Sequence, residues 1–514
     1  MSLLGIDVGT TGCKAACFSE TGELLAAAYR EYDIRHSQPG WAELDALEVW
    51  DKVQATVREV AARVAADPIV AVAVSSLGEA VVPVTHDRQV LTEPSPAGPG
   101  PRSILNFDVR GEEYLGELGR TLSDDELYAI NGNTLGNHYG LTKLMWIRDH
   151  QPQVYERADK FLHWSSFIAT MLGAEPAVDL SLANRTLLFD VGSADWSDRL
   201  LEWAELDRDK LPVAVPSGTV VGRVEQRIAA DLGLPPDVVI TTGAHDQCAN
   251  AIGCGVLEEG HAVYGMGTFI CVTPVLNAIP DPQAMMAQGL NTEHHAAPGR
   301  YVTFIYNQGG ALVKWYRDIF AAEEQRQAQR AGRDLYADLF AELPEGPSGL
   351  VALPTFTTTG PPHFIPDATG VLAGLRLGTT RGAILKGLVE AATFYIRACI
   401  ESLPEAEIAI DDFRATGGGS KSDVWVQLSA DILGRPLVRP VVTEAGALGA
   451  AIMSGVGSGV FGSYAEAVAA MVRLERSFMP NPTEHARYAP WFERYQELWR
   501  LAGAYTRELY RDRA

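Results

Sequence analysis

An aspartate followed by a turn of glycines and threonines opens the chain. Residues 4–18 read LGIDVGTTGCKAACF, an apolar strand that ends near Asp7, a GTTG turn at 9–12, and a second β-prone run. Backbone N–H groups and hydroxyls at such a turn can bind an anion, and Lys14 adds a cation beside it. The Asp7 carboxylate suits a hydrated Mg²⁺, because hard cations prefer oxygen ligands. The segment predicts a phosphate-binding hairpin, with an ordinary tight hairpin as the alternative.

A second aspartate stands where a buried strand is expected to end. Residues 237–243 (DVVITTG) run into GAHDQ, which closes with Asp246 and Gln247. A carboxylate at this point could accept the proton of a substrate hydroxyl as a phosphoryl group moves to its oxygen. The alternative is that Asp246 only caps the following helix, a role in which Asp is favoured. The residues alone leave both interpretations open.

The strand–turn–strand pattern occurs twice, and a third glycine-rich block follows. AVYGMGTFICVTPVL (262–276) is again a strand, a Gly-Thr turn and a strand. Two such hairpins facing each other across a cleft would bind a polyphosphate from both sides. The block at 413–434 joins a strand to a helix through three glycines. Glycines there let a flat ring or a ribose approach the backbone, although a plain strand–helix turn remains the alternative.

Length and charge limit the kind of protein. A chain of 514 residues is too long for one core and predicts two or more domains. The 65 acidic residues exceed the 42 basic ones, and the net charge of −23 argues against general binding to nucleic acid or to an anionic membrane. The six cysteines show no CxxC spacing, and neither a signal peptide nor a membrane-spanning apolar run is evident. We therefore expect a cytoplasmic protein with reduced thiols.

Hydrophobic periodicity predicts an α/β chain. Apolar residues near a 3.6-residue period predict a helix over 45–66, and IVAVAVSS (69–76) predicts a buried strand. The remaining expected elements are a strand at 22–34, an exposed loop at 94–101, helices at 123–131 and 139–172 (the latter interrupted near Gln151-Pro152), a small-residue helix at 444–459 and an amphipathic helix at about 483–512.

Taken in order, these motifs resemble the FGGY family of carbohydrate kinases over nearly the whole chain. The most specific block is GGGSKSDVWVQLSADILGRPL (417–437), followed by EAGALGAA (444–451). Further landmarks are PGWAELD (39–45), TLLFDV (186–191), PSGTVVGRV (216–224) and LPTFTTTGPPHFIPDATGVLAGL (353–375). Together they look most similar to xylulose kinases, with gluconate-kinase-like features as well.

The resemblance implies two ribonuclease-H-like domains around a central cleft, as in actin, hexokinase and the Hsp70 ATPase. We expect an N-terminal domain at 1–245, a C-terminal domain at 246–460, and a helical segment at 461–514 that packs back across both. The implied reaction is transfer of the ATP γ-phosphate, with Mg²⁺, to a hydroxyl of a sugar, ketose or polyol. Dimers are common in the family, so a homodimer is also compatible with the resemblance.

Motif matching also assigns roles to single residues. Asp246 becomes the expected general base, and Asp7 the residue near Mg²⁺. The expected nucleotide contacts are Thr10, Thr11, Gly12 and Lys14 in a first phosphate loop, Gly267 and Thr268 in a second, and Gly310, Gly418, Gly419 and Ser422 along the nucleotide. The expected substrate contacts are Glu79, Asp108, His138 and Gln247.

The sugar side departs from the family pattern. Xylulose kinases usually show Met-His after the third strand, whereas this chain has Gly78-Glu79, closer to the Arg-Glu of glycerol-kinase-like members. The usual AILWNDGR, SGERTPHWDP and SDAS read here as SILNFDVR (103–110), TTTGPPHFIP (357–366) and SLAN (181–184). Loss of a polar partner can change substrate preference by orders of magnitude. D-xylulose, gluconate, glycerol and a tetritol therefore all remain candidate substrates.

Two other functions would use the same phosphate clamp. An actin-like or Hsp70-like ATPase would need an appended peptide-binding domain or a polymer surface, and nothing after residue 440 resembles one. A catalytically silent binding protein is the other alternative, although Asp7, Asp246 and both Gly-Thr turns are present.

Overall fold

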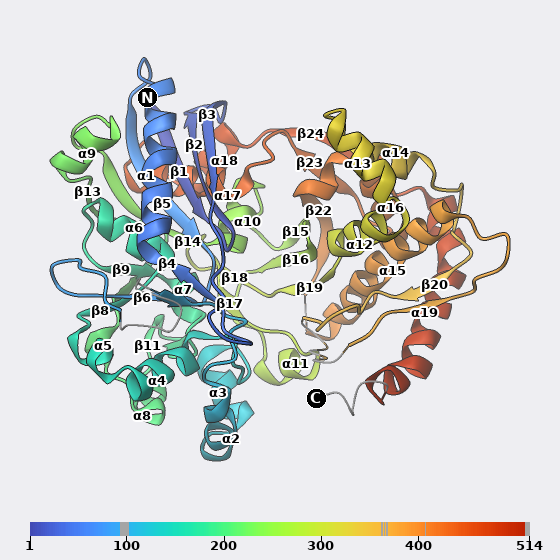
Figure 1. Cartoon of the computed structure of the whole chain (residues 1–514), viewed down its shortest axis with the longest axis horizontal. Coiled ribbons are helices and arrows are strands. Elements are labelled where there is room, and N and C mark those ends of the chain that lie inside the picture. The colour runs from blue at the N-terminus through green and yellow to red at the C-terminus, as the bar shows by residue number, and fades with distance from the viewer. Residues whose placement is uncertain (93–101, 361–362, 364, 366–367, 407, 509–514) are drawn as a thin grey trace.

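Two mixed β-sheets, one in each lobe, form the centre of the molecule (Figure 1). The computed structural model describes residues 1–92, 102–360, 363, 365, 368–406 and 408–508. Elements from the first half of the chain build one lobe, and most of those from the second half build the other (Figure 1).

The first sheet has the strand order β13-β14-β5-β1-β2-β3. Strands β3, β2 and β1 pair antiparallel with one another. Strands β5 and β14 then run parallel to β1, and the short strand β13 pairs antiparallel with β14 at the other edge. Their bounds are β1 (Ser2–Val8), β2 (Gly12–Ser19), β3 (Leu24–Glu31), β5 (Ile69–Ser76), β14 (Val239–His245) and β13 (Val220–Arg223). Helix α1 (Ala46–Arg63) covers one face of this sheet, because its valines recur at helical spacing and pack on the alternate residues of β1.

The second sheet repeats this layout. Strand β15 (Gly260–Met266) pairs antiparallel with β16 (Phe269–Leu276) and parallel with β22 (Ile410–Thr416). The other members are β17 (Glu293–His294), β18 (Tyr301–Val302), β19 (Ile305–Gln308), β23 (Leu437–Pro440) and β24 (Leu474–Phe478). The repeated order of antiparallel and then parallel strands confirms the expected pair of ribonuclease-H-like domains.

Two helices rich in small residues meet where the lobes join. They are α10 (Asp246–Gly253) and α17 (Ala445–Gly457). A Cβ on Gly449 would stand 1.9 Å from the carbonyl oxygen of Ala249, and one on Gly253 would stand 1.9 Å from that of Ala445. The two backbones are therefore in direct contact. Helix α17 also lies on β1, and both helices share one apolar core with residues of the two sheets.

The other elements surround these layers. In the first half they are β4 (Glu43–Asp45), β6 (Val81–Val84), β7 (Arg102–Ile104), α2 (Glu112–Thr121), α3 (Asp124–Asn131), α4 (Gly140–His150), α5 (Pro152–Arg157), β8 (Lys160–His163), α6 (Trp164–Leu172), β9 (Ala177–Asp179), α7 (Leu180–Asn184), β10 (Phe189–Asp190), β11 (Asp195–Trp196), α8 (Asp198–Ala204), β12 (Val213–Val215) and α9 (Gln226–Leu232). In the second half they are α11 (Pro282–Ala287), α12 (Gly310–Phe320), α13 (Ala322–Arg330), α14 (Leu335–Ala341), β20 (Val351–Leu353), β21 (Val371–Ala373), α15 (Arg381–Ser402), α16 (Asp423–Leu433), α18 (Tyr464–Met471) and α19 (Pro482–Glu508).

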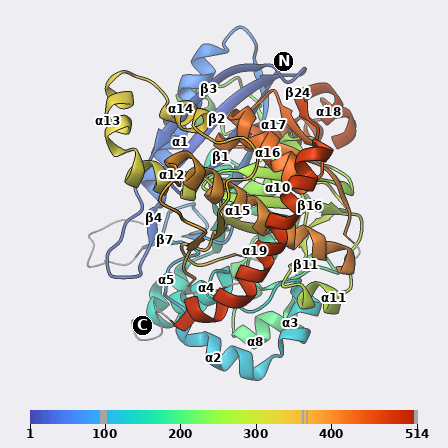
Figure 2. The same ribbon diagram turned by 90° about the vertical axis from the view of Figure 1, so that its right-hand side faces the viewer.

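The last part of the chain is divided between the lobes. Helix α18 packs on α17 at the lobe junction, whereas β24 pairs with β23 in the second sheet. Helix α19 runs across the second lobe (Figure 2), where it packs on α15, α16 and β20. Among the described residues, no helix is long and apolar enough to cross a membrane.

Most elements form close to their predicted bounds, with one clear exception. The single interrupted helix predicted over 139–172 is wrong in its middle, because β8 separates α5 from α6. β8 pairs with β6, a strand roughly 80 residues earlier in the chain, and local periodicity contains no sign of that pairing. The loop predicted at 94–101 lies outside the described residues.

The contact between α10 and α17 predicts that Gly449→Ala lowers stability. The added methyl group has no space against Ala249, and overpacking of this kind costs about 1–3 kcal/mol. Gly116→Ala in α2 is the matched control, since a Cβ there meets nothing within 4 Å. Alanine should stabilise that helix by about 0.5–1 kcal/mol. Differential scanning calorimetry compares the two variants, and a rise in melting temperature for both would contradict the close crossing.

Candidate functional site

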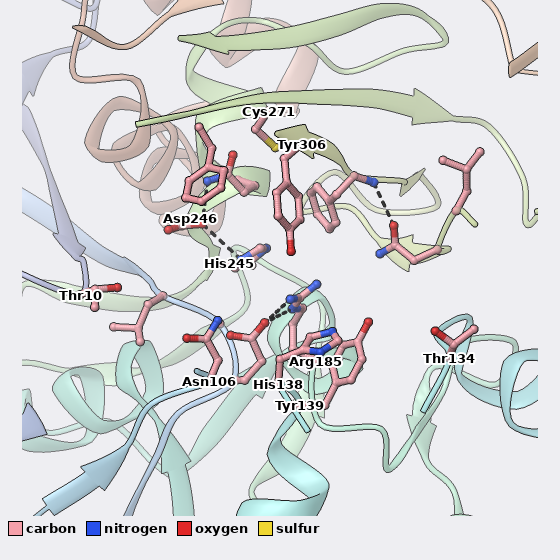
Figure 3. A pocket seen from close by; sticks show the side chains of 18 of the residues that line it. Thr10, Asn106, Thr134, His138, Tyr139, Arg185, His245, Asp246, Cys271 and Tyr306 are labelled. Carbon is pink, nitrogen blue, oxygen red and sulfur yellow. Dashed lines mark hydrogen bonds and ion pairs between the residues drawn. The ribbon is translucent and has the colours of Figure 1, made fainter. Parts of the chain in front are cut away.

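A cavity of about 340 Å³ lies between the lobes and contains most of the predicted substrate residues. Its first-lobe wall is polar and includes Asn106, His138, Tyr139 and Arg185, while its second-lobe wall includes Cys271 and Tyr306 (Figure 3). Thr10, Glu79 and His245 reach it from turns after β1, β5 and the end of β14. The carboxyl ends of three neighbouring strands thus converge on one site, which is where ligands bind in open α/β sheets.

Asp246 lies at the junction of this cavity with α10. Its Oδ1 accepts a hydrogen bond from Gln247 Nε2 at 3.1 Å and lies 3.2 Å from His245 Nε2. Its side chain keeps 31% of its exposure, so a ligand in the cavity can reach it. Burial, followed by the nearby charge of Asp7, raises the pKa of Asp246 to about 7. The cap position of α10 belongs to His245, so the carboxylate is not simply a helix cap.

The histidine beside it is uncharged. Burial, with the charge of Arg185 acting in the same direction, lowers the pKa of His245 to about 3. Burial likewise lowers the pKa of His138 to about 4. Both rings therefore serve as neutral hydrogen-bonding groups at physiological pH, and neither offsets the negative charge of the carboxylates around them.

Asp7 fits the predicted position next to a cation. Its Oδ1 accepts a hydrogen bond from Ser75 Oγ at 2.7 Å, and its Oδ2 would lie 3.1 Å from a Cβ on Gly446, in the first turn of α17. Burial raises the pKa of Asp7, so its negative charge is poorly solvated. A Mg²⁺ ion beside this carboxylate would replace the lost hydration and favour the ionised form.

The predicted first phosphate loop closes as a tight turn, with Gly9 N–H donating to the Gly12 carbonyl oxygen at 2.9 Å. Thr10 lines the cavity near Asp246 (Figure 3), and Thr11 O accepts from the backbone N–H of Tyr32. Lys14, on β2, forms an ion pair with Glu444, the residue that precedes α17. No local sequence pattern indicates this partner, which is 430 residues away in the chain.

The predicted second phosphate loop and the glycine-rich block at 413–434 come together in the second lobe. Gly310 N–H donates to the Gly267 carbonyl oxygen, and Ala311 N–H donates to that of Thr268, both at 2.9 Å. A Cβ on Gly417 would stand 3.3 Å from the backbone nitrogen of Gly267, so the two glycine-rich turns are neighbours.

The glycine-rich block at 413–434 has free space beside its backbone at Gly418. A Cβ on Gly418 meets nothing within 4 Å, whereas one on Gly419 would collide with the Trp425 ring. Ser422 Oγ accepts from Trp425 N–H and caps α16. The surface at Gly418 can therefore receive a flat ring, and the site fits a nucleotide.

A buried arginine between two glutamates dominates the sugar side. Arg185 Nε donates to Glu79 Oε1 at 2.8 Å, and Nη1 donates to Glu293 Oε1 at 2.7 Å. Burial would raise the pKa of Glu79, but the charge of Arg185 and its hydrogen bonds to this carboxylate outweigh burial and lower that pKa. Burial raises the pKa of Glu293. Glu79 was predicted, whereas Arg185, Glu293 and the cavity-lining Asn106 were missed.

Asp108, which was expected to contact the substrate, does not line this cavity. Its carboxylate is fully buried, and Oδ2 accepts from Ala42 N–H and from Arg110 Nη2, both at 2.6 Å. The Arg110 guanidinium in turn lies 3.9 Å from the centroid of the Trp41 ring. Asp108 thus holds the PGWAELD segment in place, while Asn106, two residues earlier, lines the cavity.

Comparison with known proteins identifies the family. Residues 2–253 match the N-terminal domain of the FGGY family of carbohydrate kinases, and residues 262–458 match its C-terminal domain. The chain belongs to this family. It is therefore a phosphotransferase that uses ATP with Mg²⁺ and an alcohol group as acceptor.

The relatives of this FGGY kinase differ in substrate. The glycerol kinase of Methylibium petroleiphilum is 30% identical over 511 residues, which cover 95% of this chain and 97% of the relative. The crystal structure of xylulose kinase from Rhodospirillum rubrum has a TM-score of 0.84 and 26% identity, over 98% of this chain and 100% of that one. Gluconate kinase from Lactobacillus acidophilus has a TM-score of 0.85 at 22% identity, over 98% of both chains. The expected likeness to xylulose and gluconate kinases is confirmed, and the relatives support a sugar or polyol acceptor.

The raised pKa of Asp246 predicts an acid limb in the pH profile of this kinase. A general base acts only when ionised, so log kcat/KM for the acceptor should fall by one unit per pH unit below a midpoint at or below about 7. Mg²⁺ nearby moves the midpoint down, because a cation favours the carboxylate. The affinity for Mg-ADP without acceptor, measured by calorimetry, is the control and should not share this limb. A flat profile from pH 8 to 5 would contradict the prediction.

Proposed function

We propose that this kinase phosphorylates a neutral polyol or ketose, with Asp246 as the general base. The observation that carries the proposal is that Asp246 lines the same cavity as Thr10, on the turn after β1, and Glu79, on the polar wall. A hydroxyl bound there would give its proton to Asp246 while its oxygen attacks the γ-phosphorus, the bond from that phosphorus to the bridging oxygen breaks, and ADP leaves. The carboxylate then carries the proton until the product leaves.

The charge of the polar wall supports a neutral substrate. Arg185 is already bound by Glu79 and Glu293, so two carboxylates share one guanidinium. Asp246 adds a further acid, and the burial that lowers the pKa values of His138 and His245 keeps both rings neutral. A substrate carboxylate would meet net negative charge, whereas hydroxyls can donate to Glu79, the one of these two glutamates that lines the cavity. Xylulose, glycerol and tetritols suit this wall better than gluconate does.

The nucleotide roles form the other part of the proposal. Asp7 would hold Mg²⁺, and Thr10, Thr11, Gly12, Gly267 and Thr268 would contact the phosphates. Gly310, Gly418, Gly419 and Ser422 would line the nucleotide, and Gln247, with His138, would contact the acceptor. This assigns the sugar side to a domain at 1–245 and the nucleotide side to one at 246–460. Enclosure of the cavity by both lobes would keep water from competing with the acceptor.

Replacement of the base separates chemistry from binding. Asp246→Asn should lower kcat by about 10²–10⁴-fold, because the amide cannot accept the proton, while Mg-ADP affinity changes little. Asp51→Asn, on the exposed face of α1, is the control and should leave both quantities unchanged. A coupled ADP-release assay and calorimetry measure the two effects. Turnover near the wild-type value in Asp246→Asn would contradict the assignment.

A substrate panel tests the charge argument. With Mg-ATP fixed, kcat/KM for xylulose, glycerol or erythritol should exceed that for gluconate by at least about tenfold. The reason is that the unpaired carboxylate of gluconate should weaken transition-state binding by more than about 1.4 kcal/mol, which corresponds to a factor of ten. Glu79→Gln removes one negative charge and should narrow this ratio. Gluconate as the best acceptor would overturn the neutral-substrate proposal. ADP release that needs no acceptor would indicate an ATPase.

A further inference from the structure

The ion pair between Lys14 and Glu444 joins two parts of the chain that meet beside the predicted metal carboxylate. Lys14 lies on β2 directly opposite Asp7 on β1, so both side chains face the same side of the first sheet. Glu444 immediately precedes α17, whose first turn reaches Asp7 at Gly446. The two partners are 430 residues apart in sequence. One ion pair thus links the strand after the first phosphate loop to the helix at the lobe junction.

Both members of this pair are partly exposed to solvent. The Lys14 side chain keeps 28% of its exposure and that of Glu444 keeps 31%, so neither is locked in an apolar core. The charges of both act on the Asp7 carboxylate, in opposite directions. While Glu444 is bound to it, the charge of the Lys14 ammonium is largely cancelled. A triphosphate in this loop would therefore meet Asp7 and Glu444 while the charge of Lys14 is already engaged by Glu444.

We propose that Glu444 acts as a latch on Lys14, and that Lys14 exchanges this carboxylate for a phosphate oxygen when nucleotide binds. Phosphate is the stronger partner, since it carries more charge and more acceptor sites than one carboxylate. The exchange releases the residue that leads into α17, and α17 contacts both β1 and α10, the helix that begins with Asp246. Binding of nucleotide thereby removes the contact of Lys14 with the start of α17, a helix of the lobe junction.

If Glu444 holds Lys14 in this way, replacing Glu444 and replacing Lys14 should change nucleotide affinity in opposite directions. Glu444→Gln should tighten binding of the non-hydrolysable analogue AMP-PNP with Mg²⁺ by about three- to tenfold, because Lys14 no longer has to leave a carboxylate. Lys14→Met should weaken the same binding by roughly tenfold. Glu59→Gln is the matched control, since Glu59 pairs with Arg30 and Arg63 in the same lobe, and it should leave the affinity unchanged. Isothermal titration calorimetry measures each dissociation constant.

The double variant decides between a latch and simple repulsion. If Glu444 acts through Lys14, adding Glu444→Gln to Lys14→Met should give no further change in AMP-PNP affinity. If the tightening persists in the Lys14→Met background, Glu444 only repels phosphate and the proposal is overturned. Weaker binding by Glu444→Gln alone would overturn it as well.

A chemical probe of Lys14 gives a second measurement that does not depend on affinity. Acetylation of Lys14 with acetic anhydride, followed by mass spectrometry, should be slow in the wild type and several-fold faster in Glu444→Gln. AMP-PNP should slow the reaction again in Glu444→Gln, because phosphate then covers the amine. Equal labelling of the variant with and without AMP-PNP would overturn the exchange.

Discussion

The direct backbone contact between α10 and α17 determines the geometry of the whole site. Helix α10 begins with Asp246, and α17 begins next to Glu444 and lies against Asp7 through Gly446. The proposed base, the proposed metal carboxylate and the partner of Lys14 are therefore held in one arrangement by two helices that touch through glycine and alanine. Larger side chains at this crossing would separate the helices and, with them, the carboxylates.

The electrostatics of the cleft follow from burial. Burial raises the pKa values of Asp7, Asp246 and Glu293, so each carboxylate gains from any cation or donor brought to it. Arg185 forms ion pairs with Glu79 and Glu293 on the acceptor side, and Lys14 forms one with Glu444. With a net charge of −23, the protein would balance a triphosphate with Mg²⁺, with backbone amides and with Lys14 once it has left Glu444, and it favours an acceptor without charge.

Much of the fold could be predicted from local patterns. The helix at 45–66, the strand at 69–76 and the second hairpin at 262–276 all formed, because hydrophobic period and glycine placement are local properties. The prediction of one long helix over 139–172 was wrong where β8 is held by a distant strand. The position of Asp108 also depends on distant contacts, since its side chain bonds to Ala42 and Arg110, while Asn106 lines the cavity.

The sequence by itself determined the family, the paired hairpins and the use of ATP with Mg²⁺, because these depend on short motifs whose residues are close in the chain. Only the tertiary structure decided the partners of the charged groups. Arg185 meets Glu79 and Glu293 across 106 and 108 residues, and Lys14 meets Glu444 across 430. Such contacts leave no trace in local composition, since they exist only once the sheets and the two junction helices have packed.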